Sequence, residues 1–298
     1  MSGVPRIVIV TRPTSYAMVV ARYGTEGQAR FVLGGRGEDL SALRRSHERF
    51  GELLQRVASS IPLAWRRVRI ERDELDRFLF EPDDVVVVVG QDGLVANVAR
   101  YLSGQLVIGV DGAPGHNAGV LVPHTPETAA ERIVSAGEGT PGQVEVRTLV
   151  EARLDDGQRL LGLNEVFLGQ RSHQSARYRL TLGSEAEVQS SSGVVVSTGT
   201  GATGWAASIR RCRTCELQLP GPEEARLTWF VREAWPGPGL GVGLTEGVLQ
   251  GSERLQLTSH MDRGGVIFSD GIEADALELE RGRTARVGLA PERLNLVR

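Results

Sequence analysis

Hydrophobic residues in the first third of the chain occur either as short continuous runs or at helical spacing. Continuous apolar runs bounded by turn residues are typical of strands buried on both faces, as in a parallel sheet. Such strands are predicted at residues 7–10, 65–70, 85–89 and 106–110, and helices at residues 40–57, 73–80 and 94–102. Strands and helices in this order predict a parallel sheet with helices packed against it.

From about residue 144 the pattern changes to short segments separated by turns. Strands predicted at residues 144–154 and 160–168 flank Asp155-Asp156-Gly157, a hairpin signal. Further strands are predicted at residues 178–182, 193–197, 255–258, 266–268, 277–279 and 285–289. Residues 127–142 are the predicted junction between the two regions. Residues 235–243, which contain a Gly-Pro-Gly run, are predicted to form a long loop. We therefore predict an N-terminal parallel α/β domain, residues 1–125, followed by a β-rich antiparallel domain, residues 126–298.

Composition limits the chemistry. The chain has 298 residues, 41% of them hydrophobic, and all 34 of its basic Lys and Arg residues are arginine. Absence of lysine excludes lysine-containing phosphate loops, the lysine-dependent protein-kinase site and Schiff-base chemistry. A net charge of −3 provides no global field for a polyanion, so a dedicated nucleic-acid binder is not expected.

Membrane and metal functions also find little support in the sequence. No stretch approaches the roughly 18 apolar residues of a membrane span, and the apolar run at residues 7–10 is too short for a signal peptide. We therefore expect a cytoplasmic protein that does not enter a membrane. Cys212 and Cys215 have Cys-x-x-Cys spacing without the second half of a zinc site, so idle or buried thiols are expected.

One candidate functional motif is Gly90-Gln91-Asp92-Gly93, which lies between the valine-rich strand and the next helix. In open parallel sheets, ligands bind beyond the carboxyl ends of strands, where a glycine turn and a helix N-terminus can receive an anion. Asp92 would lie where a carboxylate could take a proton from a substrate hydroxyl. The alternative is a turn with a capping aspartate.

A second candidate is the loop of residues 198–204, which matches G-x-G-x-x-G. Its position among antiparallel strands argues against a Rossmann dinucleotide site, which needs a strand-helix-strand unit. What remains is a polar loop that offers hydroxyl and amide groups to phosphate or ribose, with Trp205 able to stack on a base. The alternative is a flexible connection with Trp205 in the core.

A third candidate is the pair Asn164-Glu165, two polar residues inside an apolar run. Adjacent strand residues face opposite ways, so at least one of them points toward a buried face or a cleft. An unpartnered buried polar group costs about 1–3 kcal/mol, so either a structural hydrogen bond or a ligand must satisfy it.

Taken in order, these motifs and the late Ser269-Asp270-Gly271 resemble the ATP-dependent NAD kinase family. The resemblance spans from about residue 85 to the C-terminus. It implies a parallel α/β domain followed by a β-rich domain, with the active site between them. It also implies ATP, accompanied by Mg²⁺, as phosphoryl donor, a small-molecule nucleotide as acceptor, and a homo-oligomer.

The resemblance also implies roles for individual residues. Asp92 would match the general base toward the 2′-hydroxyl of the adenosine ribose, and Gly90 and Gly93 would shape the turn that receives phosphates. Asn164 and Glu165 would contact the nucleotide. The loop around adenine and ribose would contain Thr200, Gly201, Thr203 and Trp205.

The chain departs from the family pattern at several positions. Gln91 and Leu94 replace a glycine and a threonine of the usual Gly-Gly-Asp-Gly-Thr, and Ser192 replaces an aspartate expected near the dinucleotide. Gly199 replaces the usual proline, and the loop closes on Gly204-Trp205 in place of Ala-Tyr. The phosphotransfer machinery is therefore better supported than the identity of the acceptor.

The mechanism implied is in-line transfer of the γ-phosphate of ATP to a hydroxyl oriented by Asp92. Mg²⁺ and arginine must neutralise the developing charge, and we single out four arginines that follow strand or loop ends: Arg12, Arg210, Arg211 and Arg213. Three alternatives stay open: polyphosphate as donor, a kinase for a sugar, nucleoside or lipid acceptor, and a nucleotide-binding sensor without catalysis.

Overall fold

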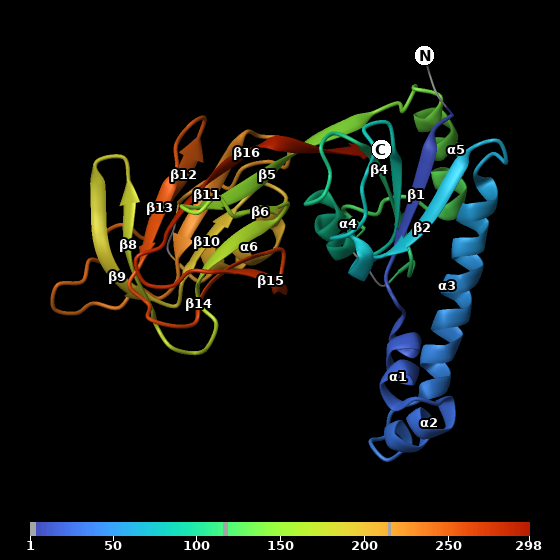
Figure 1. Cartoon of the computed structure of the whole chain (residues 1–298), viewed down its shortest axis with the longest axis horizontal. Helices are drawn as coiled ribbons and strands as arrows, with labels where there is room; N and C mark the ends of the chain where they lie inside the picture. The colour runs from blue at the N-terminus through green and yellow to red at the C-terminus, as the bar shows by residue number, and fades with distance from the viewer. Residues whose placement is uncertain (1–3, 116–118, 214–215) are drawn as a thin grey trace. The chain divides into compact units, whose positions relative to one another are not determined.

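The computed structural model describes residues 4–115, 119–213 and 216–298 (Figure 1). They form two compact units. Unit 1 comprises residues 1–101, 105–144 and 295–298, and unit 2 comprises residues 102–104 and 145–294. The division near residues 144 and 145 lies well beyond the predicted boundary at residues 125 and 126.

Unit 1 contains the predicted parallel sheet. Its strands are β1 (Arg6–Thr11), β2 (Arg66–Glu71), β3 (Val85–Gly90) and β4 (Leu106–Asp111). They are arranged in the order β2-β1-β3-β4, and every pair is parallel. The end of the chain adds to the outer edge of β4, where Asn295 and Leu296 pair with it in parallel.

Helices of unit 1 cover this sheet or pack beside it. They are α1 (Ser15–Tyr23), α2 (Glu26–Gly34), α3 (Leu40–Ser60), α4 (Asp92–Ala99) and α5 (Pro126–Gly137), with a 3-10 turn at Arg72–Glu74. Val85, Val87 and Val89 share one core with α3 and α5, while Val86 and Val88 face the other way and are equally buried. The five valines are therefore covered on both faces, as the sequence predicts.

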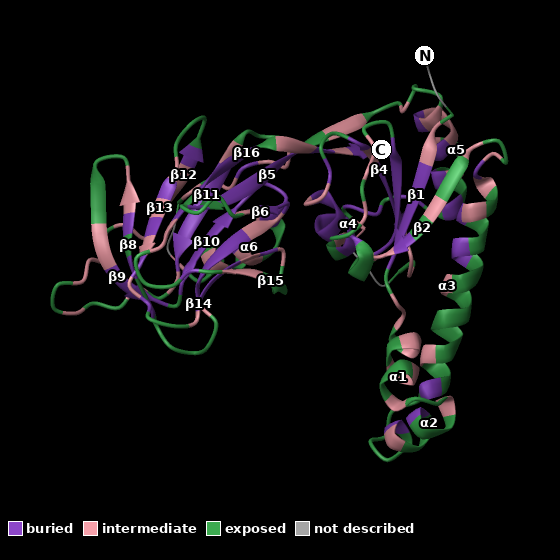
Figure 2. Cartoon of the chain, in the orientation of Figure 1, coloured by how far each residue is buried: buried purple, intermediate pink, exposed green. Residues whose placement is uncertain are grey.

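The sequence analysis missed α1 and α2. These two short helices pack on the part of α3 that extends beyond the sheet, around the small apolar cluster of Ala29, Leu33 and Leu40 (Figures 1 and 2). Their N-termini are capped by the side chains of Thr14 and Thr25. Few apolar residues reach the core from either helix, so their hydrophobic signal is weak.

Unit 2 consists of two mainly antiparallel sheets and one helix. The first sheet contains β5 (Val144–Leu154), β6 (Arg159–Gly162), β8 (Ala176–Leu182), β9 (Glu185–Ser191), β13 (Leu255–Ser259) and β16 (Thr284–Val297). The second contains β7 (Glu165–Gln170), β10 (Val194–Ser197), β11 (Arg226–Val231), β12 (Glu246–Gln250), β14 (Gly265–Ser269) and β15 (Ile272–Glu278). Helix α6 (Trp205–Arg211) follows a 3-10 turn at Gly201–Thr203.

One apolar core joins the two sheets of unit 2. In the second sheet the strand order is β12-β11-β10-β7-β14-β15, and in the first β16, β13, β8 and β9 are neighbours in that order. Tyr178 and Leu257 of the first sheet share the core with Val196 and Trp229 of the second. The predicted fold, a parallel α/β domain followed by a β-rich antiparallel domain, is confirmed.

Several predicted elements were wrong. Residues 160–168 form two strands in different sheets, β6 and β7, because the chain turns at residues 163 and 164. Residues 73–80 form no α-helix: a 3-10 turn at Arg72–Glu74 is followed by turn and irregular backbone. Residues 127–142, the predicted junction, include α5, which packs into the core of unit 1.

Three strands, β9, β11 and β12, were missed. Strand β9 was missed because five of its seven residues are Glu, Gln or Ser. The long loop predicted at residues 235–243 is confirmed, since the chain forms no helix or strand there.

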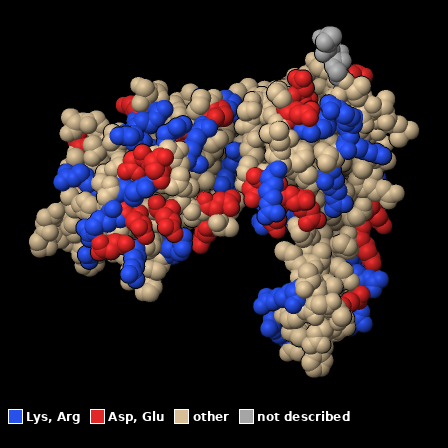
Figure 3. Space-filling model, in the orientation of Figure 1, with Lys and Arg blue, Asp and Glu red and all other residues tan. Residues whose placement is uncertain are grey.

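None of the helices in the described ranges is long and apolar enough to cross a membrane. Acidic and basic side chains are interspersed on the visible face of each unit (Figure 3).

Gly109 of β4 provides a test of how closely unit 1 is packed. A Cβ atom at this position would lie 1.9 Å from the carbonyl oxygen of Leu121 and 2.9 Å from the Cα of Val122. Because both contacts are backbone, Gly109→Ala must displace the segment that crosses β4. We expect a loss of about 1–3 kcal/mol in the free energy of unfolding, measured with urea.

The matched control is Gly51→Ala, in α3, where a Cβ would meet nothing within 4 Å. Alanine is the better helix former by about 0.5–1 kcal/mol, so this variant should be slightly more stable than the wild type. Equal stability of the two variants would contradict the close approach at Gly109.

Candidate functional site

The predicted turn at the carboxyl end of β3 is formed as expected. Gly90 ends the strand, Gln91 is extended, and Asp92 is the first residue of α4. The Gly90 carbonyl accepts a hydrogen bond from the Gly112 amide at 2.8 Å, which ties the turn to the chain leaving β4. Leu94 and the five residues after it are buried and anchor α4 beneath the turn. The N-terminus of α4 therefore lies at the carboxyl ends of β3 and β4.

The Asp92 carboxylate holds a neighbouring backbone segment. Its Oδ1 accepts hydrogen bonds from the amides of Leu121 at 2.8 Å and Val122 at 3.2 Å, and its Oδ2 accepts one from Val120 at 3.1 Å. A carboxylate offers about four acceptor positions, and donors from the described residues occupy three of them. Asp92 is also partly exposed. It is thus a structural clamp that can still accept a hydrogen bond from a ligand.

One arginine contacts this turn. Arg12, directly after β1, donates from Nη2 to Oε1 of Gln91 at 2.7 Å. The other three arginines singled out lie in unit 2. Arg213 donates to the carbonyl oxygens of Val231 and Thr245, and Arg210 to that of Leu217. Of the four, Arg12 is therefore the one that places a positive charge beside the Asp92 turn.

A second aspartate clamp in unit 2 holds the Asn164-Glu165 pair. Asp270 and Gly271 form the two-residue turn between β14 and β15, with φ values of 51° and 71°. Positive φ at both positions is the requirement that makes Asp-Gly a preferred hairpin turn. The Asp270 carboxylate accepts hydrogen bonds from the amides of Leu163 at 2.9 Å, Asn164 at 2.7 Å and Glu165 at 3.3 Å.

The threonine-rich loop is fastened to the same segment. Thr198, fully buried, donates from Oγ1 to the Leu163 carbonyl at 2.5 Å and accepts from the amides of Thr200 and Gly201. Its own amide donates to the Asn164 carbonyl at 2.9 Å. A Cβ at Gly201 would lie 2.3 Å from that carbonyl oxygen, so only glycine fits. The loop and the Asn164-Glu165 pair form one assembly.

A buried arginine, Arg147 of β5, supports the loop from beneath. It is 2% exposed, forms an ion pair with Glu145 at 2.8 Å, and donates from Nη1 to Thr200 Oγ1 at 3.2 Å. Thr203 in turn donates to the Thr200 carbonyl at 3.2 Å. The hydroxyl groups of Thr200 and Thr203 are therefore already engaged and fix the loop. The sequence analysis missed the supporting roles of Arg147, Thr198 and Asp270.

Glu165 differs from its neighbours because its carboxyl group has no hydrogen-bond partner among the described residues. It is half-buried, and burial together with the nearby negative charge of Asp270 raises its pKa from 4.5 to about 7. A partly accessible carboxyl group that titrates near neutrality is typical of functional sites. It can donate or accept a hydrogen bond to a ligand hydroxyl.

Trp205 lies apart from the hydroxyl groups of the loop. Its indole stacks on Phe167, with ring centroids 5.7 Å apart, and the Arg232 guanidinium lies 5.3 Å from its centroid. Together with Phe268 these residues border a hollow of about 160 Å³ on the second sheet. Trp205 thus packs against an aromatic ring and is itself partly exposed.

The structure brings the predicted residues together in two groups. Gly90, Asp92 and Gly93 meet at the turn in unit 1, and Asn164, Glu165, Thr200, Gly201 and Thr203 meet in unit 2. No group of three or more metal-ligating side chains occurs in the described ranges. Cys212 is exposed and has a free thiol, and Cys215 lies outside the described residues.

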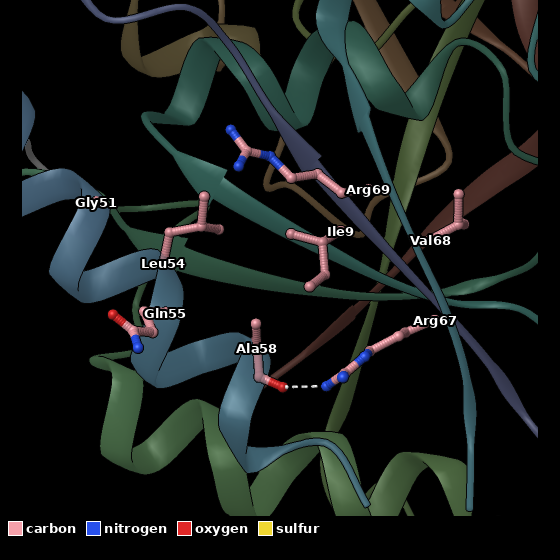
Figure 4. Close-up of a pocket in the computed structure, with 8 residues that line it drawn as sticks. All are labelled: Ile9, Gly51, Leu54, Gln55, Ala58, Arg67, Val68 and Arg69. Carbon is pink, nitrogen blue, oxygen red and sulfur yellow. Dashed lines mark hydrogen bonds between the residues drawn. The ribbon is translucent and has the colours of Figure 1, made fainter. Parts of the chain in front are cut away.

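Another hollow in unit 1 contains none of the predicted site residues. It measures about 390 Å³ and is bordered by α3, β1 and the edge strand β2 (Figure 4). Leu54 and Ala58 of α3 and Ile9 of β1 provide apolar walls. Arg67 crosses the opening and donates to the Ala58 carbonyl at 3.1 Å. This hollow marks the open edge of the unit 1 core.

The sequence of the chain is similar to that of a known NAD kinase. No protein-family model matches the sequence. Over 256 residues the chain is 28% identical to NAD kinase 2, mitochondrial, of Rattus norvegicus, a match that covers 69% of this chain and 60% of that protein.

Two solved structures resemble the whole chain. An NAD kinase from Archaeoglobus fulgidus in complex with ATP has a TM-score of 0.60 at 15% identity, covering 98% of this chain and 93% of that one. Yeast NADH kinase complexed with NADH has a TM-score of 0.62 at 12% identity, covering 99% and 83%. The chain has the NAD kinase fold. The resemblance to the NAD kinases that the motifs predicted is therefore confirmed in sequence and in fold.

The NAD kinase fold also explains why a G-x-G-x-x-G match was misleading in this chain. The loop follows β10, which is antiparallel to both its neighbours, β7 and β11. The strands on either side of the loop and α6, β10 and β11, are antiparallel, whereas the Rossmann fingerprint requires two parallel strands joined by a helix. Glycine is needed at position 201 because the loop approaches the Asn164 carbonyl closely.

The raised pKa of Glu165 gives a stability prediction. Its folded-state pKa, about 7, exceeds the unfolded value of 4.5, so the folded state binds more protons between these pH values. The free energy of unfolding should therefore fall by up to about 3 kcal/mol from this group as the pH rises from 4.5 to 7. Glu165→Gln, which cannot titrate, should lack this component in urea unfolding measured across that range.

The control for this prediction is Glu185→Gln, at an exposed position of β9. Its pH dependence should follow that of the wild type. If Glu165→Gln also follows the wild type over the same pH range, the carboxyl group of Glu165 is not the source of the proton uptake.

Proposed function

We propose that the protein transfers the γ-phosphate of ATP to the 2′-hydroxyl of the adenosine ribose of NAD, giving NADP. The observation that carries the proposal is the assembly of Asn164, Glu165 and the threonine-rich loop in unit 2. The Asp270 carboxylate and the buried Thr198 fix its backbone, yet the Glu165 carboxyl group has no hydrogen-bond partner among the described residues. The sequence match to the rat NAD kinase and the NAD kinase fold support the same activity.

In this proposal the turn in unit 1 acts on the reacting groups. The N-terminus of α4 and the amides next to Gly90 and Gly93 favour phosphate, since helix N-termini attract anions. Asp92, with acceptor capacity to spare, orients the 2′-hydroxyl and takes its proton. Arg12, held beside the turn by Gln91, stabilises negative charge on the transferred phosphoryl group.

Residues of unit 2 hold the nucleoside. Glu165 and Asn164 hydrogen-bond to ribose or base, and the backbone of the loop at Thr200, Gly201 and Thr203 surrounds them. Because the clamps at Asp270 and Thr198 fix these backbone groups before the ligand arrives, little entropy is lost on binding. Trp205 then contributes through the packing of the loop against Phe167.

Mg²⁺ enters with ATP as part of the substrate. The described residues provide no cluster of ligands for a resident cation. This fits the usual behaviour of Mg²⁺, which binds through substrate phosphates and a few protein oxygens and keeps several waters. When bound to ATP, Mg²⁺ neutralises charge on the phosphates, and positioning of the hydroxyl is left to the protein.

Two departures from the family pattern are structural in this chain. Leu94 is 2% exposed and lies beneath Gly90, so its side chain faces the core. Gln91 binds Arg12 and thereby adds a cation to the turn. The third departure, Ser192, is exposed and uncharged. A serine in place of the aspartate favours a second candidate function. In it the protein is a kinase whose acceptor lacks the group that an aspartate at this position would bind.

The finer properties of the protein belong to the same proposal. We infer a homo-oligomer that acts in the cytoplasm, with nucleotide as its partner. Support is limited to the sequence and the NAD kinase resemblance, and the related rat protein is named as mitochondrial.

The direct test is an assay with ATP, Mg²⁺ and NAD, in which NADP is detected by an NADP-specific dehydrogenase. Wild-type protein should form NADP, and Asp92→Asn should lower kcat by about 10²–10⁴, the usual contribution of a positioned general base. Asparagine keeps one acceptor oxygen for residues 120–122, so urea unfolding of the variant shows whether the clamp survives.

The matched control is Asp83→Asn, an exposed aspartate before the other end of β3. It should retain wild-type kcat. Full turnover in a folded Asp92→Asn variant would contradict the role of Asp92 as the base.

ADP formation with another acceptor, and not with NAD, would establish the second candidate function. A rise in melting temperature with nucleotide, without ADP formation, would indicate a sensor.

A further inference from the structure

The largest hollow described here lies in unit 2, away from the Asn164-Glu165 assembly. It has a volume of about 670 Å³ and lies over β8 and β9, beside the long loop that follows β11. Arg177 of β8 and Ser190 of β9 are cross-strand partners, so their side chains share one face. None of the residues that line the hollow belongs to the candidate nucleotide site.

The long loop that borders the hollow is held in place by backbone hydrogen bonds to the edge strand. The Trp235 amide donates to the Ser190 carbonyl at 2.7 Å, and the Gly241 amide donates to the Val188 carbonyl at 2.8 Å. On the opposite side the His260 amide donates to the Arg177 carbonyl at 2.8 Å. These bonds tie both sides of the hollow to the first sheet, so it is a built feature of the fold.

The ionisable side chains that line the hollow are all basic, although Asp262 and Glu187 contact two of the lining residues from outside it. Arg177, His260 and Arg281 line it, and its lining includes no aspartate or glutamate. Arg281 pairs with Asp262, but Arg177 has no ion pair among the described residues. Two serine hydroxyls, from Ser175 and Ser190, add hydrogen-bonding capacity. This combination favours an anion, because guanidinium and hydroxyl groups donate to phosphate or carboxylate oxygens.

Trp235 supplies an aromatic surface to the same hollow. Its side chain is 66% exposed, although tryptophan is normally well buried. Pro238 and Leu240 of the same loop add apolar contact. The exposed Trp235 indole and the Arg177 guanidinium line the same hollow. A planar ring that carries a negative charge could stack on the indole while its charge binds the guanidinium.

We propose that this hollow is a second ligand site, which binds a small planar aromatic anion, with Trp235 stacking on the ring and Arg177 binding the anionic group. Its volume lies within the range of about 300–1,000 Å³ that is usual for small-molecule sites. The proposal extends beyond the kinase function, since it concerns different residues and requires no turnover.

The test follows the tryptophan indole N–H signals in two-dimensional ¹⁵N–¹H NMR spectra. The chain has four tryptophans, and Trp235→Phe identifies the Trp235 signal by its loss. Phenyl phosphate is the probe, because it combines a ring and an anion but lacks the ribose and adenine of a nucleotide. On titration the Trp235 signal should move in a saturable manner, and phenol or inorganic phosphate alone should need at least about tenfold more ligand.

Two matched variants decide the role of the charge. Arg177→Gln should raise the half-saturation concentration about tenfold, as expected for loss of one charged hydrogen bond. Arg179→Gln removes an exposed arginine from the same face of β8, two residues away and outside the hollow. This variant should change the half-saturation concentration less than about twofold.

Two results would overturn the proposal. One is a Trp235 signal that does not move at millimolar phenyl phosphate. The other is an equal effect of Arg177→Gln and Arg179→Gln, which would show attraction to general positive charge. Because the readout is binding at Trp235, a failure of this site leaves the kinase proposal unaffected, and loss of kinase activity leaves this result unchanged.

Discussion

The structure depends on one repeated interaction, a carboxylate that accepts hydrogen bonds from three consecutive backbone amides. Asp270 holds residues 163–165 in this way, and Asp92 holds residues 120–122. Hydrogen bonds to a charged group contribute about 1.5–3 kcal/mol each, more than neutral ones. Each aspartate therefore fixes a short backbone segment that lies mostly outside the strands.

The consequences in unit 2 follow directly. The Asp270 clamp ends β6 and starts β7 in another sheet, so the chain crosses between sheets at Leu163 and Asn164. The carbonyls exposed by that crossing receive Thr198 and bring the threonine-rich loop beside Glu165. Burial raises the pKa of Glu165, and the negative charge of the same Asp270 carboxylate adds to that shift. A single side chain thus holds the strand crossing and the loop in place and contributes to the protonation of the half-buried carboxyl group.

Much of this could be predicted from sequence, and the limits have physical causes. The five valines and the glycine turn after them identify β3 and α4, because a fully apolar strand followed by a helix has few alternatives. The crossing at residues 163 and 164 could not be predicted, since it depends on a carboxylate more than a hundred residues away. Helices α1 and α2 and strand β9 were missed because their side chains are mostly solvated or polar. Arg147 was not distinguished from the other arginines, as only the fold shows that it is buried.

In the proposed function both aspartate-clamped groups bind nucleotide. Hydrogen–deuterium exchange of the intact protein, with and without NAD and Mg²⁺·ATP, tests this most directly. The account predicts slower amide exchange on ligand addition both at residues 90–94 and 119–122 and at residues 162–166 and 198–205. Protection of only one group, or of neither, at nucleotide concentrations that saturate binding would contradict it.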